Sequence, residues 1–414
     1  MNRHLILWNQ SINMLNIFSD GVRRDPYPLY DQMRSHSPLL YVPAPFDGYL
    51  IFDYDGVKRA LNDHESFSSR VPAPRHWFIF FDPPAHSKLR GLISRAFTPK
   101  SIAAIESHIQ ELSRQLLDQT LQQPEFDLAT EFSVPLPMKV IAGMIGIPPA
   151  DWARFKCWSD SILKLSYART GGEEAVLAGR EFTEVTGEMN EYLSGMIDQR
   201  RAQPEDDLLT RLMQAEIEGE QLAQEEILGF FQLLVVGGQE TTTNLINNAI
   251  LCFLEFPDQL ALLRKNTELL PSAIEEVLRF RSPLQWVMRT PRRDLEMHGQ
   301  TIPAGKLVLP MIGSANRDPK YFKDPNQFTI RREPNPHIAF GHGIHSCLGA
   351  ALARMEARIG LGDFLQRVPH FGPASSQPWE PRRALHVHGP TNLRLRVGMP
   401  RRGTSVLMAS SAGI

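Results

Sequence analysis

Apolar residues recur at helical spacing through most of this chain, and the helical pattern is almost continuous from about residue 127 to residue 270. The longest predicted helix runs from about Glu225 to Phe256 and stops before Pro257, because proline cannot continue a helix. Most sides of this helix are apolar, which predicts a buried position. About thirty helical residues would extend roughly 45 Å, enough to cross the whole molecule.

Capping residues, first-turn prolines and helical spacing predict four shorter helices. These cover residues 53–61, a segment that opens at 83–84, residues 271–281 and residues 348–368. Residues 48–52 look like a strand, and residues 284–308 and 382–397 alternate between apolar and polar, which predicts a small β region. Because the β segments come from both ends of the chain, we expect a mainly α fold with minor β in a single domain, residues 1–400, and a flexible tail at 401–414.

Composition limits the possible classes of function. Hydrophobic residues make up 42% and charged residues 22% of the chain, as in ordinary globular proteins. The net charge of −2 argues against nucleic acid as the main partner. No apolar stretch approaches the roughly 18 residues needed to span a membrane, and the N-terminal apolar run is too short for a signal peptide. We therefore expect a cytoplasmic protein with no nucleic-acid or membrane partner, present as a monomer.

The three cysteines, at positions 157, 252 and 347, are too far apart for a disulfide framework or a zinc motif. Cys347 differs from the others because Phe340, Gly341 and Gly349 surround it directly before a predicted helix. The glycines would let the backbone turn tightly and approach a flat ligand, and the phenylalanine could cover the sulfur. The helix N-terminus would stabilise a thiolate and lower the thiol pKa. Such a loop can present one thiolate to a haem iron; the alternative is a structural cysteine in a glycine-rich turn.

The centre of the long helix contains Gly237, Gly238, Glu240 and Thr241. Each glycine costs about 1 kcal/mol relative to alanine in a helix, a cost that the close approach of a ligand would offset. The carboxyl and hydroxyl groups lie together, as a proton relay requires. The alternative is a tight helix crossing in which the hydroxyl bonds back to the preceding turn.

Glu276 and Arg279 are three residues apart on an apolar helix and can pair on one face. A buried pair of this kind needs further partners, and Arg332 is a plausible third member. Taken alone, such a pair is typical of any surface helix.

A second set of basic residues could bind carboxylates at the edge of a haem. His86 and Arg90 are four residues apart on one predicted helix face, and Arg289 and His345 are two further donors. The alternative for each of them is a solvated charge.

Taken together, these residues resemble the cytochrome P450 family, in its soluble bacterial form. The resemblance covers nearly the whole chain and includes residues 25–30, 82–90, 96–99 and 315–319. It implies a P450-like fold, a large helical part with a small β region. Haem b would lie between the long central helix and the helix that follows the Cys347 loop.

The resemblance also implies a role for each candidate residue. Cys347 would ligate the iron, and Glu240 and Thr241 would deliver protons during oxygen activation. The implied cofactor contacts are His86, Arg90, Arg289, Phe340, Gly341, His345, Gly349, Gly237 and Gly238. Glu276, Arg279 and Arg332 would form a structural triad behind the loop. Gln239 and Thr329 depart from residues common in bacterial members, without affecting this mechanism.

The implied activity is that of a haem-thiolate monooxygenase, which inserts one oxygen atom from O₂ into a hydrophobic substrate by C–H hydroxylation or epoxidation. Secondary metabolism or lipid, terpenoid or steroid oxidation would be its setting. The alternatives are a peroxide-driven or rearranging haem-thiolate enzyme and a non-catalytic haem-binding sensor. The intact Glu240–Thr241 pair favours the monooxygenase.

An external ferredoxin and a ferredoxin reductase would supply the electrons. Basic residues on the Cys347 side could form the docking face: Lys88, Arg95, Lys100, Arg354 and Arg358. Several residues, most of them apolar, would line the substrate pocket and predict a hydrophobic small-molecule substrate: Trp77, Phe78, Phe80, Val236, Leu284, Trp286, Val287 and Thr391. Some of these side chains could instead belong to the core.

Overall fold

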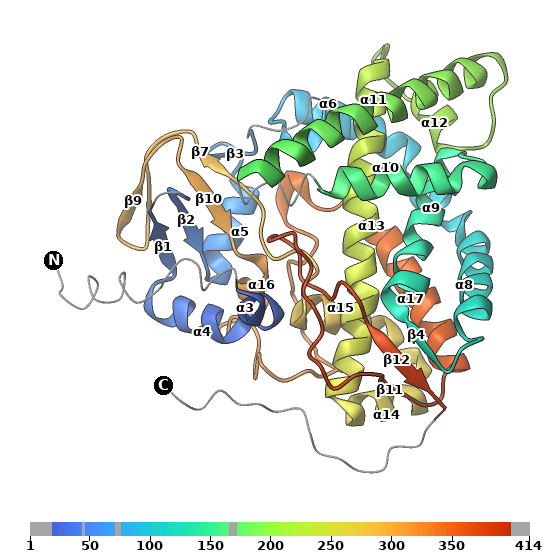
Figure 1. The fold of residues 1–414 in the computed structure, drawn as a ribbon. Coiled ribbons are helices and arrows are strands. Elements are labelled where there is room, and N and C mark those ends of the chain that lie inside the picture. Colours follow the sequence, from blue (N-terminus) through green and yellow to red (C-terminus); the bar gives the residue numbers. More distant parts are fainter. Residues whose placement is uncertain (1–18, 44–45, 71–75, 165–171, 399–414) are drawn as a thin grey trace.

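The long helix expected from the apolar pattern is α13 (Gln224–Glu255), which runs through the middle of the helical part of the protein (Figure 1). A computed structural model of the chain describes residues 19–43, 46–70, 76–164 and 172–398. The ends of α13 differ by one residue from those expected, and Phe256 is its C-cap because Pro257 begins the next helix. The fold is mainly α with minor β, as the sequence predicted.

The other helices surround α13 or pack on the small sheets. They are α3 (Asp20–Arg24), α4 (Tyr27–His36), α5 (Tyr54–Asn62), α6 (Ala85–Ala96), α7 (Pro99–Ala103), α8 (Glu106–Thr120), α9 (Pro135–Ile145), α10 (Trp152–Lys164), α11 (Gly172–Ala202), α12 (Leu208–Gln214), α14 (Pro257–Lys265), α15 (Leu270–Phe280), α16 (Ile312–Ala315) and α17 (Ala350–Arg367). The four shorter predicted helices correspond to α5, α6, α15 and α17.

Local signals explain where several helices begin. The Asp53 carboxylate accepts from the Gly56 N–H and caps α5, as predicted. Pro84 is the N-cap of α6, and Pro271 lies in the first turn of α15, where a missing N–H costs nothing. These caps place the predicted helix starts within one or two residues.

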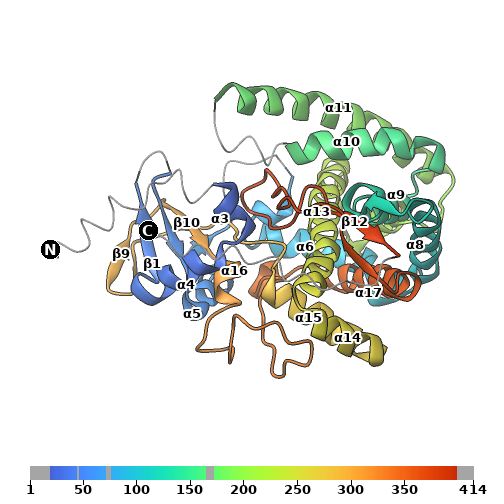
Figure 2. The same cartoon turned by 60° about the horizontal axis from the view of Figure 1, so that its bottom comes forward.

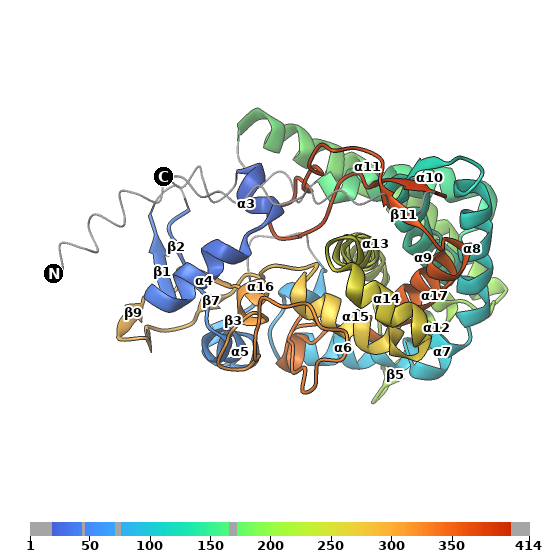
Figure 3. The ribbon, with the colours of Figure 1, turned by 90° about the horizontal axis from the view of Figure 1, so that it is seen from below.

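Helices pack against α13 on several sides. Viewed from below, α13 is seen end-on with α9, α15 and α17 around it (Figure 3). The α10 and α11 helices run side by side and lie over one end of it (Figure 2). Phe231, Ile250 and Phe253 of α13 have at most 1% exposure, because they face the large apolar core that these helices share. Tertiary packing of its apolar side chains therefore stabilises this helix.

The strands of the described residues form two three-stranded sheets and three two-stranded ones. They are β1 (Leu39–Val42), β2 (Gly48–Ile51), β3 (Phe67–Ser68), β4 (Glu125–Asp127), β5 (Glu216–Ile217), β6 (Glu220–Gln221), β7 (Thr290–Pro291), β8 (Leu295–Met297), β9 (Gln300–Ile302), β10 (Leu307–Pro310), β11 (Phe371–Pro373) and β12 (Arg394–Val397). One sheet has the order β1-β2-β10, with β1 antiparallel and β10 parallel to β2. Another has the order β11-β12-β4, so strands from distant parts of the chain lie together.

Two sequence expectations were incomplete. The region expected to be helical from 127 to 270 contains the β5–β6 hairpin, whose turn residues Glu218 and Gly219 have φ of 54° and 80°. Residues 382–397 form only one regular strand, β12, because prolines limit the pairing of Pro381 with Pro390 to an isolated bridge. The expected tail at 401–414 lies outside the described residues. Within the described ranges, no helix is both long and apolar enough to cross a membrane.

Candidate active site

The Cys347 segment folds into a tight loop directly before α17, and Gly349 is the N-cap of that helix. The Cys347 N–H donates to the Phe340 carbonyl at 2.8 Å, which closes the loop. Gly341 and Gly343 both have a φ of 74°, a left-handed conformation that side chains rarely allow. A Cβ at Gly343 would also come within 2.9 Å of the backbone at the end of α5. The backbone conformation of the loop therefore requires glycine at these two positions.

The Cys347 thiol does not have the lowered pKa that its position before a helix predicted. The side chain is accessible to solvent. Protein atoms nevertheless lie around it, and this burial raises its pKa above the usual value, against the Gly349 N–H and the Arg90 and Arg354 charges, which lower it. The prediction identified a real stabilising donor and missed the larger effect of desolvation. Coordination of a metal cation would deprotonate the thiol in spite of burial.

The four basic residues predicted to bind carboxylates come together beside this loop. His86 and Arg90 lie on α6, Arg289 lies just before β7, and His345 belongs to the loop itself. The His86 and His345 ring centroids are 4.0 Å apart. The Arg90 Nη2 donates to the Ser346 carbonyl at 2.7 Å, which connects α6 to the loop. The four residues therefore lie close together, as the sequence predicted.

This basic cluster has too few acceptors within the described residues. Both ring nitrogens of His86 are buried without a hydrogen-bond partner. The carboxylate of Asp82 already accepts the Ser68 hydroxyl and pairs with Arg292, both at 2.6 Å. A ligand with carboxylate groups would supply the missing acceptors.

Burial lowers the pKa values of three residues in the basic cluster. Burial, and then the Arg90 charge, lowers the pKa of His86 to about 4. Burial, and then His86, lowers the pKa of His345 to about 3. Burial lowers the pKa of Arg289 to about 10. All three groups are desolvated, and the two histidines also face positive charges, so an anion bound here would be favoured.

The two glycines at the centre of α13 have different surroundings. A side chain at Gly237 would meet no protein atom within 4 Å, whereas one at Gly238 would come within 2.8 Å of Ile141 on α9. Close packing with α9 explains Gly238, and its predicted contact with a cofactor is not supported. Gly237 faces open space, as a glycine that makes room for a ligand must.

Glu240 and Thr241 also differ in their contacts. The Thr241 hydroxyl donates to the Gly237 carbonyl at 2.5 Å, so the bond back to the preceding turn, considered as an alternative, is present. Glu240 is only 4% exposed, and burial raises its pKa to about 7 against the Arg382 charge, which lowers it. A carboxyl group that titrates near neutral pH is suited to accept and release protons.

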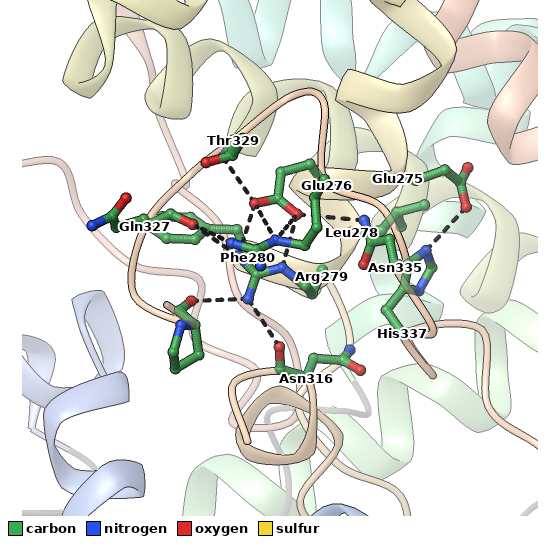
Figure 4. Close-up of polar contacts among 12 residues, drawn as sticks. Glu275, Glu276, Leu278, Arg279, Phe280, Asn316, Gln327, Thr329, Asn335 and His337 are labelled. Carbon is green, nitrogen blue, oxygen red and sulfur yellow. Dashed lines mark hydrogen bonds and ion pairs between the residues drawn. The ribbon is translucent and has the colours of Figure 1, made fainter. Parts of the chain in front are cut away.

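The predicted triad residues are in contact. Glu276 and Arg279 on α15 form an ion pair in which both side chains are fully buried. The Arg279 Nε and Nη2 each donate to the Glu276 carboxylate at 2.8 Å, and the Arg332 Nε donates to the same carboxylate at 3.0 Å. Figure 4 shows the Glu276–Arg279 pair at the centre of this network.

The triad holds the segment that leads to the Cys347 loop. Arg279 Nη1 donates to the carbonyls of Asn316 and Pro325 at 3.1 and 2.9 Å, and the Thr329 N–H donates to Glu276 at 2.9 Å. Backbone groups therefore satisfy the buried charges and are themselves fixed against α15 (Figure 4).

Glu275 is a residue that the sequence reasoning missed. It accepts two hydrogen bonds from Arg354 of α17, at 2.7 and 2.8 Å. It accepts a third from His337 at 3.0 Å, which Figure 4 shows. Burial opposes ionisation of Glu275, but these donors outweigh it and hold its pKa at about 2. Arg354 in turn lies 4.4 Å from the centre of the Phe340 ring. The sequence feature that could have revealed it is its position directly before Glu276, because the Glu275 carboxylate on the same helix also needs partners.

A protein-family model described as Cytochrome P450 matches residues 176–386. The chain belongs to the cytochrome P450 family. The putative cytochrome P450 YjiB of Bacillus subtilis is 42% identical over 360 residues, which are 86% of this chain and 90% of that protein. The cytochrome P450 monooxygenase PikC of Streptomyces venezuelae is 37% identical over 361 residues, 83% of this chain and 84% of PikC.

A solved structure supports the same family at the level of the fold. The crystal structure of CYP109E1 from Bacillus megaterium in complex with testosterone has a TM-score of 0.84 and 39% identity. The match covers 91% of this chain and 100% of that one. The protein is therefore an oxidoreductase of the P450 monooxygenase family, and the family implies a haem cofactor. The Cys347 loop, the acceptor-poor basic cluster and the open side of Gly237 fit such a group.

The aromatic residues expected in the P450 substrate pocket lie beside α13. The Trp77 Nε1 donates to Gln232 of α13 at 3.0 Å, and the Phe80 ring stacks on Trp77 with centroids 6.2 Å apart. The Phe78 ring stacks on His86 at 5.9 Å, so this segment adjoins the basic cluster. Val236 on α13 is partly buried against the same core.

The other expected pocket residues are dispersed. Trp286 lines an apolar groove between α4 and the β1-β2-β10 sheet, and its Nε1 donates to the Leu385 carbonyl at 3.2 Å. Its assignment to the substrate pocket is therefore not supported. Leu284 and Val287 pack against the core next to α5, and the Thr391 hydroxyl donates to a backbone carbonyl at 3.2 Å.

Three of the five basic residues expected to dock a ferredoxin are already paired. Lys88 pairs with Glu220, Arg354 with Glu275 and Arg358 with Glu106. Arg95 on α6 and Lys100 on α7 are exposed and make no ion pair within the described residues. A docking face on this side would therefore depend most on these two.

Proposed function

We propose that this P450 is a haem b monooxygenase that inserts one atom of O₂ into a hydrophobic organic substrate and reduces the other atom to water. Each turnover would consume two electrons and two protons together with the substrate C–H or C=C bond. The observation that carries the proposal is the presentation of Cys347 by a closed loop, beside a basic cluster whose acceptors are missing.

We assign these residues distinct tasks. The bound haem would supply oxygen activation with Cys347 as the iron ligand. Arg90, Arg289, His86 and His345 would orient it by donating to its two carboxylates. The Glu276–Arg279–Arg332 triad would keep the loop in position. Glu240 and Thr241 would move protons, because a carboxyl with a pKa of about 7 can donate and be reprotonated at physiological pH.

The remaining expectations are also proposals. The electrons would come from an external ferredoxin and its reductase. The aromatic segment at Trp77–Phe80 supports an apolar substrate such as a terpenoid, steroid, fatty acid or polyketide, and the related CYP109E1 has been crystallised with testosterone. We further propose a monomer in the cytoplasm, with residues 1–400 forming one domain.

The identity of the iron ligand can be tested by Cys347→Ser. The ferrous protein with carbon monoxide should show the absorption of a haem-thiolate, and the serine variant should lose it. Retention of that absorption would remove Cys347 from the site. A control, Cys157→Ser on α10, should keep the wild-type spectrum, because this exposed cysteine lies in another element.

The substrate class can be tested by titrating the ferric protein with testosterone, a monoterpene, palmitate and a macrolactone. A saturable low-spin to high-spin change with one of them would identify the class. If none of the four compounds gives the spin-state change and a highly charged compound does, the prediction of an apolar substrate is wrong.

A further inference from the structure

The groove between α4 and the β1-β2-β10 sheet contains none of the residues to which we assign a task in catalysis. Figure 3 shows α3 and α4 beside β1 and β2, which contribute to its lining. Its enclosed part has a volume of about 70 Å³, several times the space that one water molecule needs. Buried apolar residues of the sheet line the groove together with four apolar side chains that are only partly buried: Leu29, Leu40, Phe46 and Trp286. An apolar surface of this kind is typical of a docking site.

The polar groups of the groove limit what can bind there. Arg23 is the one charged side chain among the described lining residues, because burial lowers the pKa of His388 to about 3. The Arg23 Nη1 pairs with Asp20 at 3.3 Å, so the groove does not need an anion to balance its charge. The Arg23 Nη2 is buried and has no hydrogen-bond partner among the described residues. A fitting occupant is therefore apolar and uncharged, and it offers a carbonyl that accepts from this nitrogen.

The segment of the chain before α3 has this composition. Residues 5–18, which lie outside the described part of the chain, include no charged residue and nine apolar ones: Leu5, Ile6, Leu7, Trp8, Ile12, Met14, Leu15, Ile17 and Phe18. The segment also ends next to the groove, because the lining residues Val22 and Arg23 follow Phe18 by four and five positions. Ten extended residues can span roughly 33 Å, about twice the length of the ten-residue α4, so the segment is long enough to cover the groove.

We propose that the N-terminal segment, residues 5–18, docks in this groove and inserts apolar side chains between α4 and the β1-β2-β10 sheet. Docking removes these side chains and the partly buried groove residues from water, which stabilises the docked state. A carbonyl group of the segment accepts the hydrogen bond from the Arg23 Nη2. The short connection to Val22 gives the segment an effective concentration on the order of millimolar, so at micromolar protein it excludes a second copy of the chain.

The first test locates the segment by photocrosslinking in the haem-loaded full chain at low micromolar concentration. Phe46→benzoylphenylalanine places the photoreactive group in the groove, and Leu29→benzoylphenylalanine repeats the test from α4. Peptide mass spectrometry should find crosslinks to residues 5–18. Lys265→benzoylphenylalanine, at an exposed position of α14, is the control and should give no such crosslink. Absence of these crosslinks from both groove positions would overturn the proposal.

A mixture of isotope-labelled and unlabelled chains separates docking within one chain from docking between two chains. The two crosslinked peptides should carry the same label, because the tethered segment occupies the groove of its own chain. Pairs with mixed labels would show that a second copy fills the groove. Loss of the crosslink on adding phosphatidylglycerol vesicles would show that the segment prefers a lipid surface. Either result would contradict the proposal.

The second test asks whether apolar side chains hold the segment in the groove. Leu15→Glu combined with Phe18→Glu should lower the crosslink yield from Phe46→benzoylphenylalanine about fivefold or more, because burial of a charge is unfavourable. Asn13→Glu combined with Asn16→Glu adds the same charge at polar positions of the segment and should keep most of the yield. Equal yields from the two double variants would overturn docking by apolar side chains. Neither test measures haem ligation or activity, so this inference and the proposed function can fail separately.

Discussion

Single buried carboxyl groups show how strongly the surroundings set a protonation state. Glu356 on α17 is 2% exposed, its Oε2 has no protein partner within the described residues, and burial raises its pKa to about 8. Glu275 on α15, which pairs with Arg354 of α17, has a pKa of about 2 because its donors outweigh burial. Residue type alone, which is what a sequence supplies, does not distinguish these two glutamates.

We expect Glu356→Gln to stabilise the protein increasingly as the pH rises. The folded pKa of about 8 lies above the ordinary 4.5, so the unfolded chain loses its proton first and stability falls with pH between these values. At about 1.4 kcal/mol per pKa unit, the difference should reach roughly 3 kcal/mol near pH 7. Urea unfolding from about pH 5 to pH 8 measures it.

The control for this comparison is Glu111→Gln, an exposed glutamate on α8. Its effect on the free energy of unfolding should change little with pH. A Glu356→Gln effect that is equally independent of pH would show that Glu356 does not carry a proton in the folded state.

At the scale of elements, α13 combines two kinds of glycine. The sequence predicted both glycines in one buried helix, where each lowers helix stability relative to alanine. Their roles, however, depend on what packs against each of them. Gly238 packs on Ile141 of α9, and Gly237 faces open space. The Cys347 loop behaves differently, since Gly341 needs its left-handed φ whatever packs on it. Local geometry could therefore be predicted for the loop, and only packing separated the two glycines of the helix.

We expect Gly237→Ala to stabilise the apoprotein more than Gly238→Ala does. Alanine at 237 should add up to about 1 kcal/mol of stability, because helix propensity improves and nothing obstructs its Cβ. Alanine at 238 must displace Ile141, which offsets that gain. Chemical unfolding of both variants measures the difference.

Haem binding provides the second readout for this pair. Gly237→Ala should weaken haem retention relative to Gly238→Ala, since its methyl group enters the open side of α13. Greater stability of Gly238→Ala than of Gly237→Ala would contradict the assigned packing.

At the scale of the whole molecule, charges far apart in the chain meet and neutralise one another. Arg358 of α17 pairs with Glu106 of α8, and Arg354 with Glu275. These pairs leave Arg95 and Lys100 as exposed charges on the side where a ferredoxin was expected to dock. Reversing Arg354 would disturb the Cys347 loop as well as the surface, so it is a poor probe of docking.

We expect Arg95→Glu and Lys100→Glu each to weaken ferredoxin binding by about 1 kcal/mol, roughly fivefold, with a smaller effect at high salt. Surface plasmon resonance against a bacterial ferredoxin measures this. Lys265→Glu on α14, at the opposite end of the molecule from α6 in Figure 1, is the matched control. Equal affinities for all three variants would place the docking face elsewhere.

The family, the long helix and most candidate residues could be read from the sequence, because helical period, caps and a short cysteine loop are local patterns. The relation between distant segments could not. Arg382 lies beside Glu240, Glu275 holds Arg354, and Trp286 belongs to a groove next to α4. Each of these depends on long-range packing, and burial there changes the pKa of Cys347 in the direction opposite to the one its helix predicted. A pattern records which side chains are adjacent along an element; their solvent and charged neighbours are set only when the elements fold together.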